Sequence, residues 1–422
     1  MSAQTPGERL PFRPALKACF LLPDLQLSGG VGVVLRHAWH VARRHPDIEV
    51  TIVLTTHDAE PAPYGVLRDL NIRHVEDAAE NGPFDVAVAT WWQTAYRLFE
   101  VPASRYGYFV QSMEDRFYLG DDPVERAAAG LTYDMPVSFI TEATWIRDLL
   151  RALRPDAECH YVRNGIDKQV FRSPERIEPS DPSAPLRVLI EGNPAHWLKA
   201  VPDALAAVKL ADRPLQTTLV SPRSLEGDHP EVQRAIGPLA EEEFVSELAA
   251  SDVVLKLSRV EGMFGPPLEG FHLGATCVVT PVTGQDEYVN HGWNGVVADF
   301  DDIPGVARWL DLLAADREFL DELRANALET ARAWPSWEET ADDMATALRA
   351  IAASPGGDSL VSARHIMRHA WSAAEMQRAE LLRRRSAHEY MTKQLADFRE
   401  TRAYRLARFL QRAKPRLRGR GR

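Results

Sequence analysis

Residues 258–299 carry the most informative stretch of this chain, SRVEGMFGPPLEGFHLGATCVVTPVTGQDEYVNHGWNGVVAD. Two glutamates, Glu261 and Glu269, flank a turn rich in glycine and proline. A helical stretch, 268–273, and an apolar strand-like run, 276–282, follow. Proline suits the first turn of a helix, where free N–H groups and a partial positive charge favour a phosphate. The stretch therefore predicts a cradle for a nucleotide phosphate, with two carboxylates placed to hold hydroxyl groups.

Short apolar runs alternate with helix-like stretches through both halves of the chain. Such runs are typical of parallel strands that helices cover on both faces. The expected strands are 17–23, 49–55, 85–90, 106–111, 136–141, 160–162, 187–191, 217–220, 253–258, 277–281 and 295–299. The proline- and serine-rich stretch 173–185 reads as a linker. We predict an α/β protein with two doubly wound, Rossmann-like domains and a ligand in the cleft between their strand ends.

The overall composition agrees with two domains and a tail. A chain of 422 residues exceeds one ordinary core, and its 45% hydrophobic and 26% charged residues are typical of a soluble globular protein. The cysteines Cys19, Cys159 and Cys277 are isolated, which favours reduced thiols without metal-binding spacing. The start of the chain, MSAQTPGERLPFRP, lacks the apolar stretch of a signal peptide. We expect a cytoplasmic protein, or one peripheral on the inner face of the cell membrane.

A glycine-rich segment follows the first expected strand, in PDLQLSGGVG at 23–32. Gly29 and Gly30 lie before a helix expected from Val33, so this loop can bring backbone N–H groups to a phosphate. A tight strand-to-helix turn also needs glycine, which is the structural alternative. The spacing does not match the G-x-G-x-x-G fingerprint of dinucleotide-binding enzymes, which makes a dehydrogenase the weakest functional class.

The pattern around the two glutamates resembles the signature of retaining GT-B glycosyltransferases of family four. The matching features are the spacing of Glu261 and Glu269, the Gly274–Ala275 pair and Glu287. VRNGID at 162–167 also resembles the turn that precedes the linker in that family.

The resemblance implies a division of the chain into four parts. Residues 1–177 would form the acceptor-side domain, and 178–335 the domain that binds the nucleotide sugar. Residues 336–353 resemble the helix that returns to the N-terminal domain, and 354–422 form a basic helical tail.

The same resemblance implies roles for individual residues. Glu261 would position the sugar ring and Lys199 would neutralise the leaving diphosphate, which makes them the catalytic candidates. The residues implied in donor binding are Gly29, Gly30, Asn193, Phe264, Gly265 and Glu269, the last of which would hold the ribose hydroxyls. Preorganised donors can stabilise a leaving phosphate without a metal ion, and the sequence has no paired His/Cys spacing. We therefore expect no metal and no cofactor besides the co-substrate, a nucleoside-diphosphate sugar.

Two positions depart from the family pattern. Asn193 stands where the family has an arginine against the donor diphosphate, so His196, Arg259 or a helix N-terminus is expected to compensate. The family motif EGFGLP is EGMFGP here, which moves its glycine to Gly265 and changes the N–H groups that face the phosphate.

A second cluster of polar and aromatic residues lies at strand ends of the first domain. The segment YFVQSMEDRFY resembles a subgroup of bacterial polysaccharide glycosyltransferases, including rhamnosyltransferases, that carry VQ-x-x-E. Gln111 and Glu114 are therefore candidates for sugar or acceptor contacts. Trp91, and Trp92 beside it, can stack on a sugar ring, although tryptophans at such positions are often core residues.

The last 45 residues differ from the rest in charge. Residues 378–422 contain 15 basic and 4 acidic side chains, a net charge of +11, whereas the whole chain carries −11 and residues 1–377 therefore −22. Residues 375–396 read as a charged helix, and 401–413 place apolar side chains on one stripe flanked by arginines. Such a helix suits an anionic membrane surface or a lipid-linked substrate. The alternatives are a tail folded on the acidic body or a disordered end; nucleic acid is not expected, because no recognised module is present.

The implied activity is retaining, metal-independent transfer of a hexosyl or deoxyhexosyl group to a hydroxyl of a growing envelope glycan or lipid-linked acceptor. Two other classes stay open at this point. A nucleotide-sugar epimerase would need acid and base residues at the sugar and no acceptor site, and the basic tail argues against it. A non-catalytic nucleotide-binding partner on a decayed GT-B fold would account for the two departures.

Overall fold

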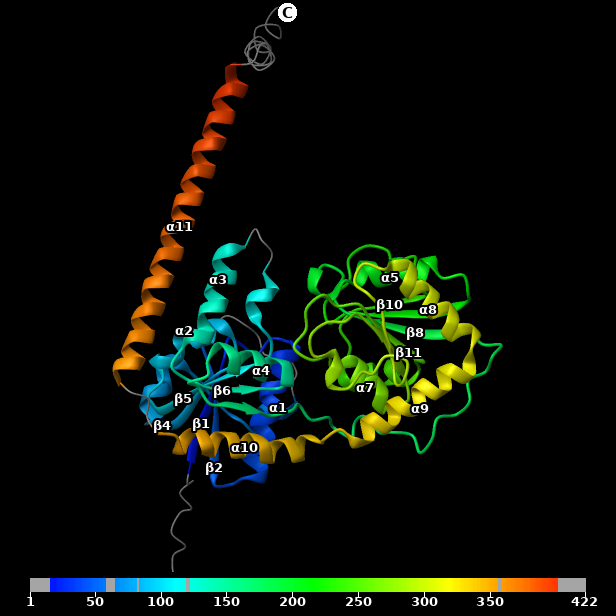
Figure 1. The fold of residues 1–422 in the computed structure, drawn as a ribbon, viewed down its shortest axis with the longest axis horizontal. Coiled ribbons are helices and arrows are strands. Elements are labelled where there is room, and N and C mark those ends of the chain that lie inside the picture. Colours follow the sequence, from blue (N-terminus) through cyan, green and yellow to red (C-terminus); the bar gives the residue numbers. More distant parts are fainter. Residues whose placement is uncertain (1–15, 58–64, 82, 119–121, 356–358, 401–422) are drawn as a thin grey trace, which may run out of the picture.

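Two parallel β-sheets with helices on both faces form the protein in this computed structural model, which describes residues 16–57, 65–81, 83–118, 122–355 and 359–400 (Figure 1). The strand order is β3-β2-β1-β4-β5-β6-β7 in the N-terminal sheet and β10-β9-β8-β11-β12-β13 in the C-terminal sheet. The first sheet contains β1 (Leu16–Leu22), β2 (Ile48–Leu54), β3 (Asn71–His74), β4 (Phe84–Ala89), β5 (Ala103–Val110), β6 (Ser138–Thr141) and β7 (Cys159–Tyr161). The second contains β8 (Leu186–Glu191), β9 (Leu215–Val220), β10 (Arg234–Ile236), β11 (Val253–Lys256), β12 (Thr276–Val279) and β13 (Val296–Val297).

Helices connect the strands and cover the sheets. The α-helices are α1 (Gly29–Arg44), α2 (Trp92–Arg97), α3 (Pro123–Leu131), α4 (Thr144–Leu153), α5 (Val201–Leu210), α6 (Glu241–Ala249), α7 (Pro266–His272), α8 (Ile303–Ala315), α9 (Arg317–Ala333), α10 (Trp337–Ala353) and α11 (Ser359–Glu400). Short 3₁₀ helices are η1 (Gly65–Asp69), η2 (Val75–Asn81), η3 (Leu98–Glu100), η4 (Glu114–Phe117), η5 (Thr132–Asp134), η6 (Trp197–Lys199) and η7 (Gln285–Glu287).

The predicted fold class, two doubly wound domains with a helical C-terminal region, is confirmed. Each expected strand is present, with ends shifted by at most a few residues. Two further strands, β3 and β10, lie at the outer edges of the two sheets and were not expected. Their sequences, NIRH and RAI, lack an apolar run because an edge strand keeps its side chains partly exposed.

Strand β1 shows why the N-terminal sheet needs helices on both faces. Phe20 and Leu22 pack in one apolar cluster, and Cys19 and Leu21 alternate into the other. Successive side chains of a strand point to opposite faces, so a strand buried on both sides is apolar throughout. The first cluster also contains residues of α10, among them Met344.

Helix α10 begins after the C-terminal domain and packs against α1 and β5 of the N-terminal domain (Figure 1). Gly165, in the NG turn, permits this return, because a Cβ there would lie 2.5 Å from the backbone of Trp337. The capping box of Ser336 and Glu339 starts the helix at this point.

Helix α11 packs against α3 and η5 near its start and then extends away from both domains (Figure 1). Arg368 Nη2 lies 2.6 Å from Asp134 Oδ2 in this contact. Farther along, Leu381, Tyr390 and Phe398 are exposed. In the part of the chain that the structure describes, no helix combines the length and apolarity needed to cross a membrane. The apolar stripe predicted at 401–413 lies outside the described residues.

Candidate functional site

Charged side chains gather at the carboxyl ends of the central strands of the C-terminal sheet. Glu191 ends β8, Lys256 ends β11, and Glu261 follows in the turn before α7. Glu269 lies in the first turn of α7. Lys199 ends η6, and its Nζ lies 2.8 Å from Glu261 Oε1. The structure thus brings the predicted catalytic pair into direct contact.

A glycine allows Lys199 to approach the strand ends this closely. Gly192 follows β8 with φ +147°, a backbone angle that other residues rarely adopt. A Cβ at this position would lie 2.9 Å from Val201 Cγ2 and 3.1 Å from Lys199 Cβ.

Lys256 is a member of the site that we did not predict. Its side chain is 1% exposed, and its Nζ lies 2.5 Å from Glu191 Oε2 and 3.7 Å from Glu261 Oε1. The sequence feature that could have revealed it is a lysine inside the apolar run VVLKL. A charged side chain on a buried strand requires a partner of opposite charge.

The charges of the cluster set its protonation states. Burial raises the pKa of Glu261, but Lys199 and Lys256 outweigh it and leave this pKa below its ordinary value. Burial lowers the pKa of Lys256, yet Glu191 and Glu261 leave it above its ordinary value. For Glu269, burial is the largest effect and raises the pKa to about 7, although Arg36 acts in the opposite direction. Glu261 and Lys256 are therefore ionised at neutral pH, whereas Glu269 is near its midpoint.

Gly29 and Gly30 are the first two residues of α1, so the loop predicted before a helix at Val33 is wrong. The helix starts earlier because Ser28 caps it, with Ser28 Oγ accepting a hydrogen bond of 3.1 Å from the N–H of Val31. The amide of Gln111 lies against the helix start, since a Cβ on Gly30 would be 3.4 Å from its Oε1. The two glycines therefore present a helix N-terminus, which favours an anion.

Gly262 lies at a close contact between the two domains. A Cβ on Gly262 would overlap the backbone carbonyl oxygen of Gln111. The Gly262 carbonyl accepts a hydrogen bond of 2.9 Å from Trp145 Nε1 and packs against Gly284. Because the Gln111 side chain also lies next to Gly30, the structure brings the start of α1 and the glutamate turn of the other domain together.

Glu287 stabilises the same interface between the two domains through hydrogen bonds. Its Oε1 accepts hydrogen bonds of 2.5 Å from both the backbone N–H and the Oγ1 of Thr144, at the start of α4. Its Oε2 accepts a hydrogen bond of 2.9 Å from the hydroxyl of Tyr161. A carboxylate at a helix N-terminus is electrostatically favourable, so the motif glutamate holds the domains together here.

Three predicted donor-binding residues contribute to the local fold. Asn193 Oδ1 accepts a hydrogen bond of 3.0 Å from the N–H of Ala195, which shapes the turn after β8. Phe264 is fully buried, and its carbonyl accepts a hydrogen bond from the hydroxyl of Tyr288. Gly265 caps the start of α7, and a Cβ there would lie 3.8 Å from Glu269 Oε1. Of these three, Gly265 lies beside the predicted ribose site.

The candidates to replace the family arginine differ in their surroundings. Arg259 Nη2 lies 2.6 Å from Asp203 Oδ2 and 2.7 Å from Asp301 Oδ1, so two carboxylates already neutralise it. Burial, together with nearby Lys199, lowers the pKa of His196, which keeps the imidazole neutral at pH 7. Among the described residues, Lys256 supplies a cation beside Glu261 that neither candidate provides.

Glu114 is directed into the N-terminal domain, away from the predicted sugar contact. Its Oε2 accepts hydrogen bonds from the N–H of Trp92 (2.6 Å) and the hydroxyl of Tyr108 (2.9 Å), and burial raises its pKa to about 8. Trp92 is also buried, whereas Trp91 is half-buried and stacks on Phe117. Gln111 is therefore the member of the VQ-x-x-E segment that the structure places with the donor candidates.

Glu142, after β6, is a further carboxyl group that we did not predict. Its Oε2 accepts a hydrogen bond of 2.7 Å from Asn164 Nδ2, and a Cβ on Gly262 would lie 3.0 Å from its Oε1. Burial raises its pKa to about 8, so the group is mostly protonated at neutral pH. The only signal in the sequence is an acidic residue directly after an apolar strand.

Comparisons with known proteins agree with this geometry. Residues 225–334, which include both glutamates, match the family described as Glycosyl transferases group 1. The matched residues lie in the C-terminal domain. No curated protein matches the sequence.

Solved structures of similar fold extend over both domains. HepE of Anabaena, solved with UDP and glucose, has a TM-score of 0.62 and 15% identity over 79% of this chain and 100% of its own. Sucrose-phosphate synthase of Thermosynechococcus elongatus has a TM-score of 0.65 and 13% identity over 79% and 98%. A point mutant of TarM of S. aureus, solved with UDP, has a TM-score of 0.60 and 9% identity over 79% and 99%. The fold is therefore GT-B.

Proposed function

We propose that this protein is a retaining glycosyltransferase that moves a sugar from a nucleoside-diphosphate sugar to a hydroxyl group of an acceptor. The observation that carries the proposal is the Lys199–Glu261 pair at the strand ends of the group 1 domain. Across the Gly262–Gln111 contact lies the N-terminus of α1, so a bound diphosphate would meet an ammonium from one domain and free N–H groups from the other.

Residues of the site would bind the donor and stabilise its leaving group. Glu269 would accept hydrogen bonds from the ribose hydroxyls, and Glu261 would position the sugar ring. The bond between the anomeric carbon and the phosphate oxygen breaks, and the acceptor oxygen bonds to the same face of that carbon. The departing phosphate oxygen takes the acceptor proton, so this route needs no protein base. Lys199 and the start of α1 would stabilise the charge that develops on the diphosphate.

Lys256 makes this donor site electrostatically reasonable without a metal ion. Glu191, Glu261 and Glu269 would otherwise place three carboxylates close to an anionic donor. Because Lys256 neutralises Glu191 and also faces Glu261, Lys199 has only Glu261 to balance and can also face a bound diphosphate. We therefore propose metal-independent transfer, with Lys256 acting as a positioning residue behind the pair.

The structural relatives support a choice of donor. HepE was solved with UDP-glucose, and TarM with UDP, so we propose a uridine-diphosphate hexose as the first donor to test. For the acceptor we propose a growing envelope glycan or a lipid-linked glycan, supported by the basic C-terminal region.

The test is thermal unfolding of the full chain with a panel of nucleotide sugars, with EDTA in every sample. We expect one nucleotide family to raise the Tm by several degrees, and the shift to be lost in Glu269→Ala. The control is Glu329→Ala, which removes an exposed carboxylate from α9 and should retain the shift.

The other outcomes discriminate between the alternatives. No shift with any nucleotide would overturn the donor site. A shift with conversion of the sugar nucleotide in the absence of acceptor would support an epimerase. A shift with neither conversion nor transfer to extracted lipid-linked glycans would support a non-catalytic nucleotide-binding protein.

A further inference from the structure

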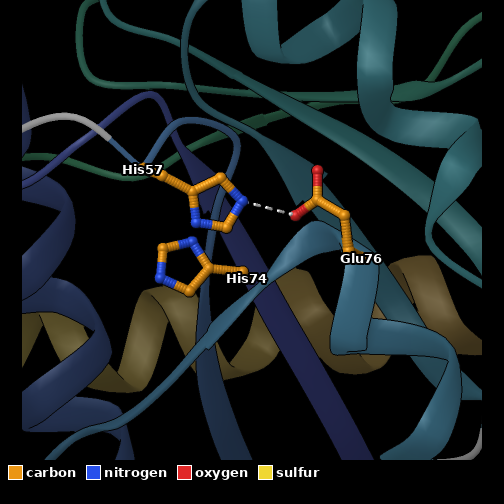
Figure 2. Close-up of side chains that lie close together, drawn as sticks. All are labelled: His57, His74 and Glu76. Atoms are coloured by element: carbon orange, nitrogen blue, oxygen red, sulfur yellow. Dashed lines mark hydrogen bonds and ion pairs between the residues drawn. The ribbon is translucent and has the colours of Figure 1, made fainter.

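Three side chains with metal-ligating atoms, none of them among the donor-site residues, meet at the edge of the N-terminal sheet. His57 follows β2, His74 ends β3, and Glu76 lies in η2 (Figure 2). Each offers one ligand atom, and these atoms all lie within 4.8 Å of one another. The imidazole rings are stacked, with centroids 4.1 Å apart and an interplanar angle of 22°, and the Glu76 carboxylate lies beside the His57 ring.

One pair of these ligand atoms has the separation found in a tetrahedral metal site. His57 Nε2 and Glu76 Oε2 are 3.2 Å apart. Ligand atoms on a tetrahedral zinc ion, with bonds of about 2.0–2.1 Å, are separated by about 3.4 Å. The side chains of His57 and Glu76 are 60% and 53% exposed, so they can adjust toward the less exposed His74 without disturbing the core.

His74 has a nitrogen that an ion would satisfy. Its Nδ1 is buried and has no hydrogen-bond partner among the described residues. A buried polar atom without a partner is costly, and native proteins seldom keep one without a bound water or ion. Coordination within this cluster would remove that cost.

Arg97 holds the carboxylate in a suitable orientation. Its Nη2 lies 3.3 Å from Glu76 Oε1, and its Nη1 donates a hydrogen bond of 2.6 Å to the carbonyl of Thr55. Glu76 Oε2 is left facing His57. Partners outside the ligand set orient metal-binding carboxylates in this way.

We propose that His57, His74 and Glu76 bind a divalent transition-metal ion of the zinc class, with water in the fourth position. Two imidazoles and one carboxylate are ligands that suit zinc, rather than magnesium or calcium. The ion would tie the end of β2 to the corner between β3 and η2. This site is separate from the proposed metal-free transfer chemistry, so either proposal can fail without the other.

The test is a Zn²⁺ titration of the full chain after removal of metal with EDTA, in competition with a chromophoric chelator. Wild type is expected to bind one equivalent tightly, and Co²⁺ in its place should give the visible absorption of a tetrahedral site. His57→Ala and Glu76→Gln change exposed ligands and should each weaken binding by ~100-fold. Arg97→Gln should weaken it by ~10-fold through the orientation of Glu76.

The control is His388→Ala, which removes an exposed histidine of α11 and should bind like wild type. Circular dichroism and the Tm in EDTA check that the variants fold alike. Binding of less than half an equivalent by wild type, or equal affinity in His57→Ala and His388→Ala, would overturn the proposal. In that case a hydrogen bond between His57 Nε2 and Glu76 Oε2 would account for the 3.2 Å contact.

Discussion

Glu269 has a protonation state that can be tested through the donor. Its pKa of about 7 means that its ionised form, the better acceptor for two ribose hydroxyls, gains population as the pH rises from 6 to 8. We predict that the affinity for a nucleoside diphosphate increases by up to about tenfold over this range. Isothermal titration calorimetry at pH 6 and pH 8 measures this affinity. Glu269→Gln should bind the nucleoside diphosphate weakly at both pH values, with no dependence on pH.

The same carboxyl affects stability in the opposite direction. Because the pKa of Glu269 is higher in the folded protein than its ordinary value of 4.5, folding favours the protonated form. Its contribution to the free energy of unfolding is therefore present below pH 4.5 and is lost as the pH rises to about 7. A donor-free protein that instead gained stability from this group over that range would contradict the assigned pKa.

Lys256 allows structural and functional roles to be separated. Lys256→Met alone should reduce the free energy of unfolding by about 3–5 kcal/mol, because it leaves Glu191 without its buried partner. In the double variant Lys256→Met, Glu191→Met, apolar side chains replace both charges, and stability should return toward wild type. Urea unfolding measures both.

Transfer activity of the double variant then decides the role of Lys256. We expect kcat/KM to remain at least tenfold below wild type, because Glu261 loses a cation 3.7 Å away. Full activity together with recovered stability would show that the pair serves the fold alone.

Site residues were predictable from the sequence where a motif fixes their separation along the chain. Glu261, Glu269 and Lys199 belong to that class, and the structure places Lys199 against Glu261. The partner of Lys256 was not predictable, because Glu191 lies on a different strand and the pairing of β8 with β11 exists only in the folded sheet. Glu114 was misplaced for a related reason, since a strand-end carboxylate can point into its own domain as well as into the cleft.

The turn between β11 and α7 sets how closely the domains approach. A Cβ on Gly262 would overlap the carbonyl of Gln111, so Gly262→Ala cannot form the contact seen here. We predict a loss of about 100-fold in kcat/KM, since a displacement near 1 Å in a reacting pair has this effect. The control is Gly65→Ala, where a Cβ meets nothing within 4 Å. Equal activity in both variants would mean that transfer does not require this contact.

Sequence patterns located the elements better than their ends. The central strands were evident because burial on both faces makes them apolar throughout. The start of α1 was missed because glycines at 29, 30 and 32 suggest a loop, whereas the Ser28 cap makes them helical. Edge strands such as β10 carry little apolar signal and become recognisable only from their neighbours.

The molecule as a whole separates its charges, with +11 on residues 378–422 and −22 on the rest. This basic region also contains exposed apolar residues of α11, including Leu382, Met391 and Leu395. We predict that the full chain sediments with anionic lipid vesicles but not with neutral ones, and that salt releases it.

A charge variant tests this prediction in the intact chain. Replacing Arg402, Arg405, Arg408 and Arg412 by glutamine should weaken vesicle binding by at least ~100-fold, at roughly 1 kcal/mol for each basic residue. The matched control replaces four exposed arginines outside the tail, Arg172, Arg176, Arg223 and Arg308. If both quadruple variants bind alike, the basic end does not direct the protein to membranes.

The return of α10 has a consequence for biosynthesis. The apolar cluster beneath β1 and α1 includes Met344, Leu348 and Ile351, which leave the ribosome only after the entire second sheet has been made. Domains usually fold in order from the N-terminus during translation. Here the C-terminal domain can complete its fold before the N-terminal domain does. Until α10 packs in place, the N-terminal domain exposes an apolar face. A chaperone that binds such faces would protect this domain during synthesis.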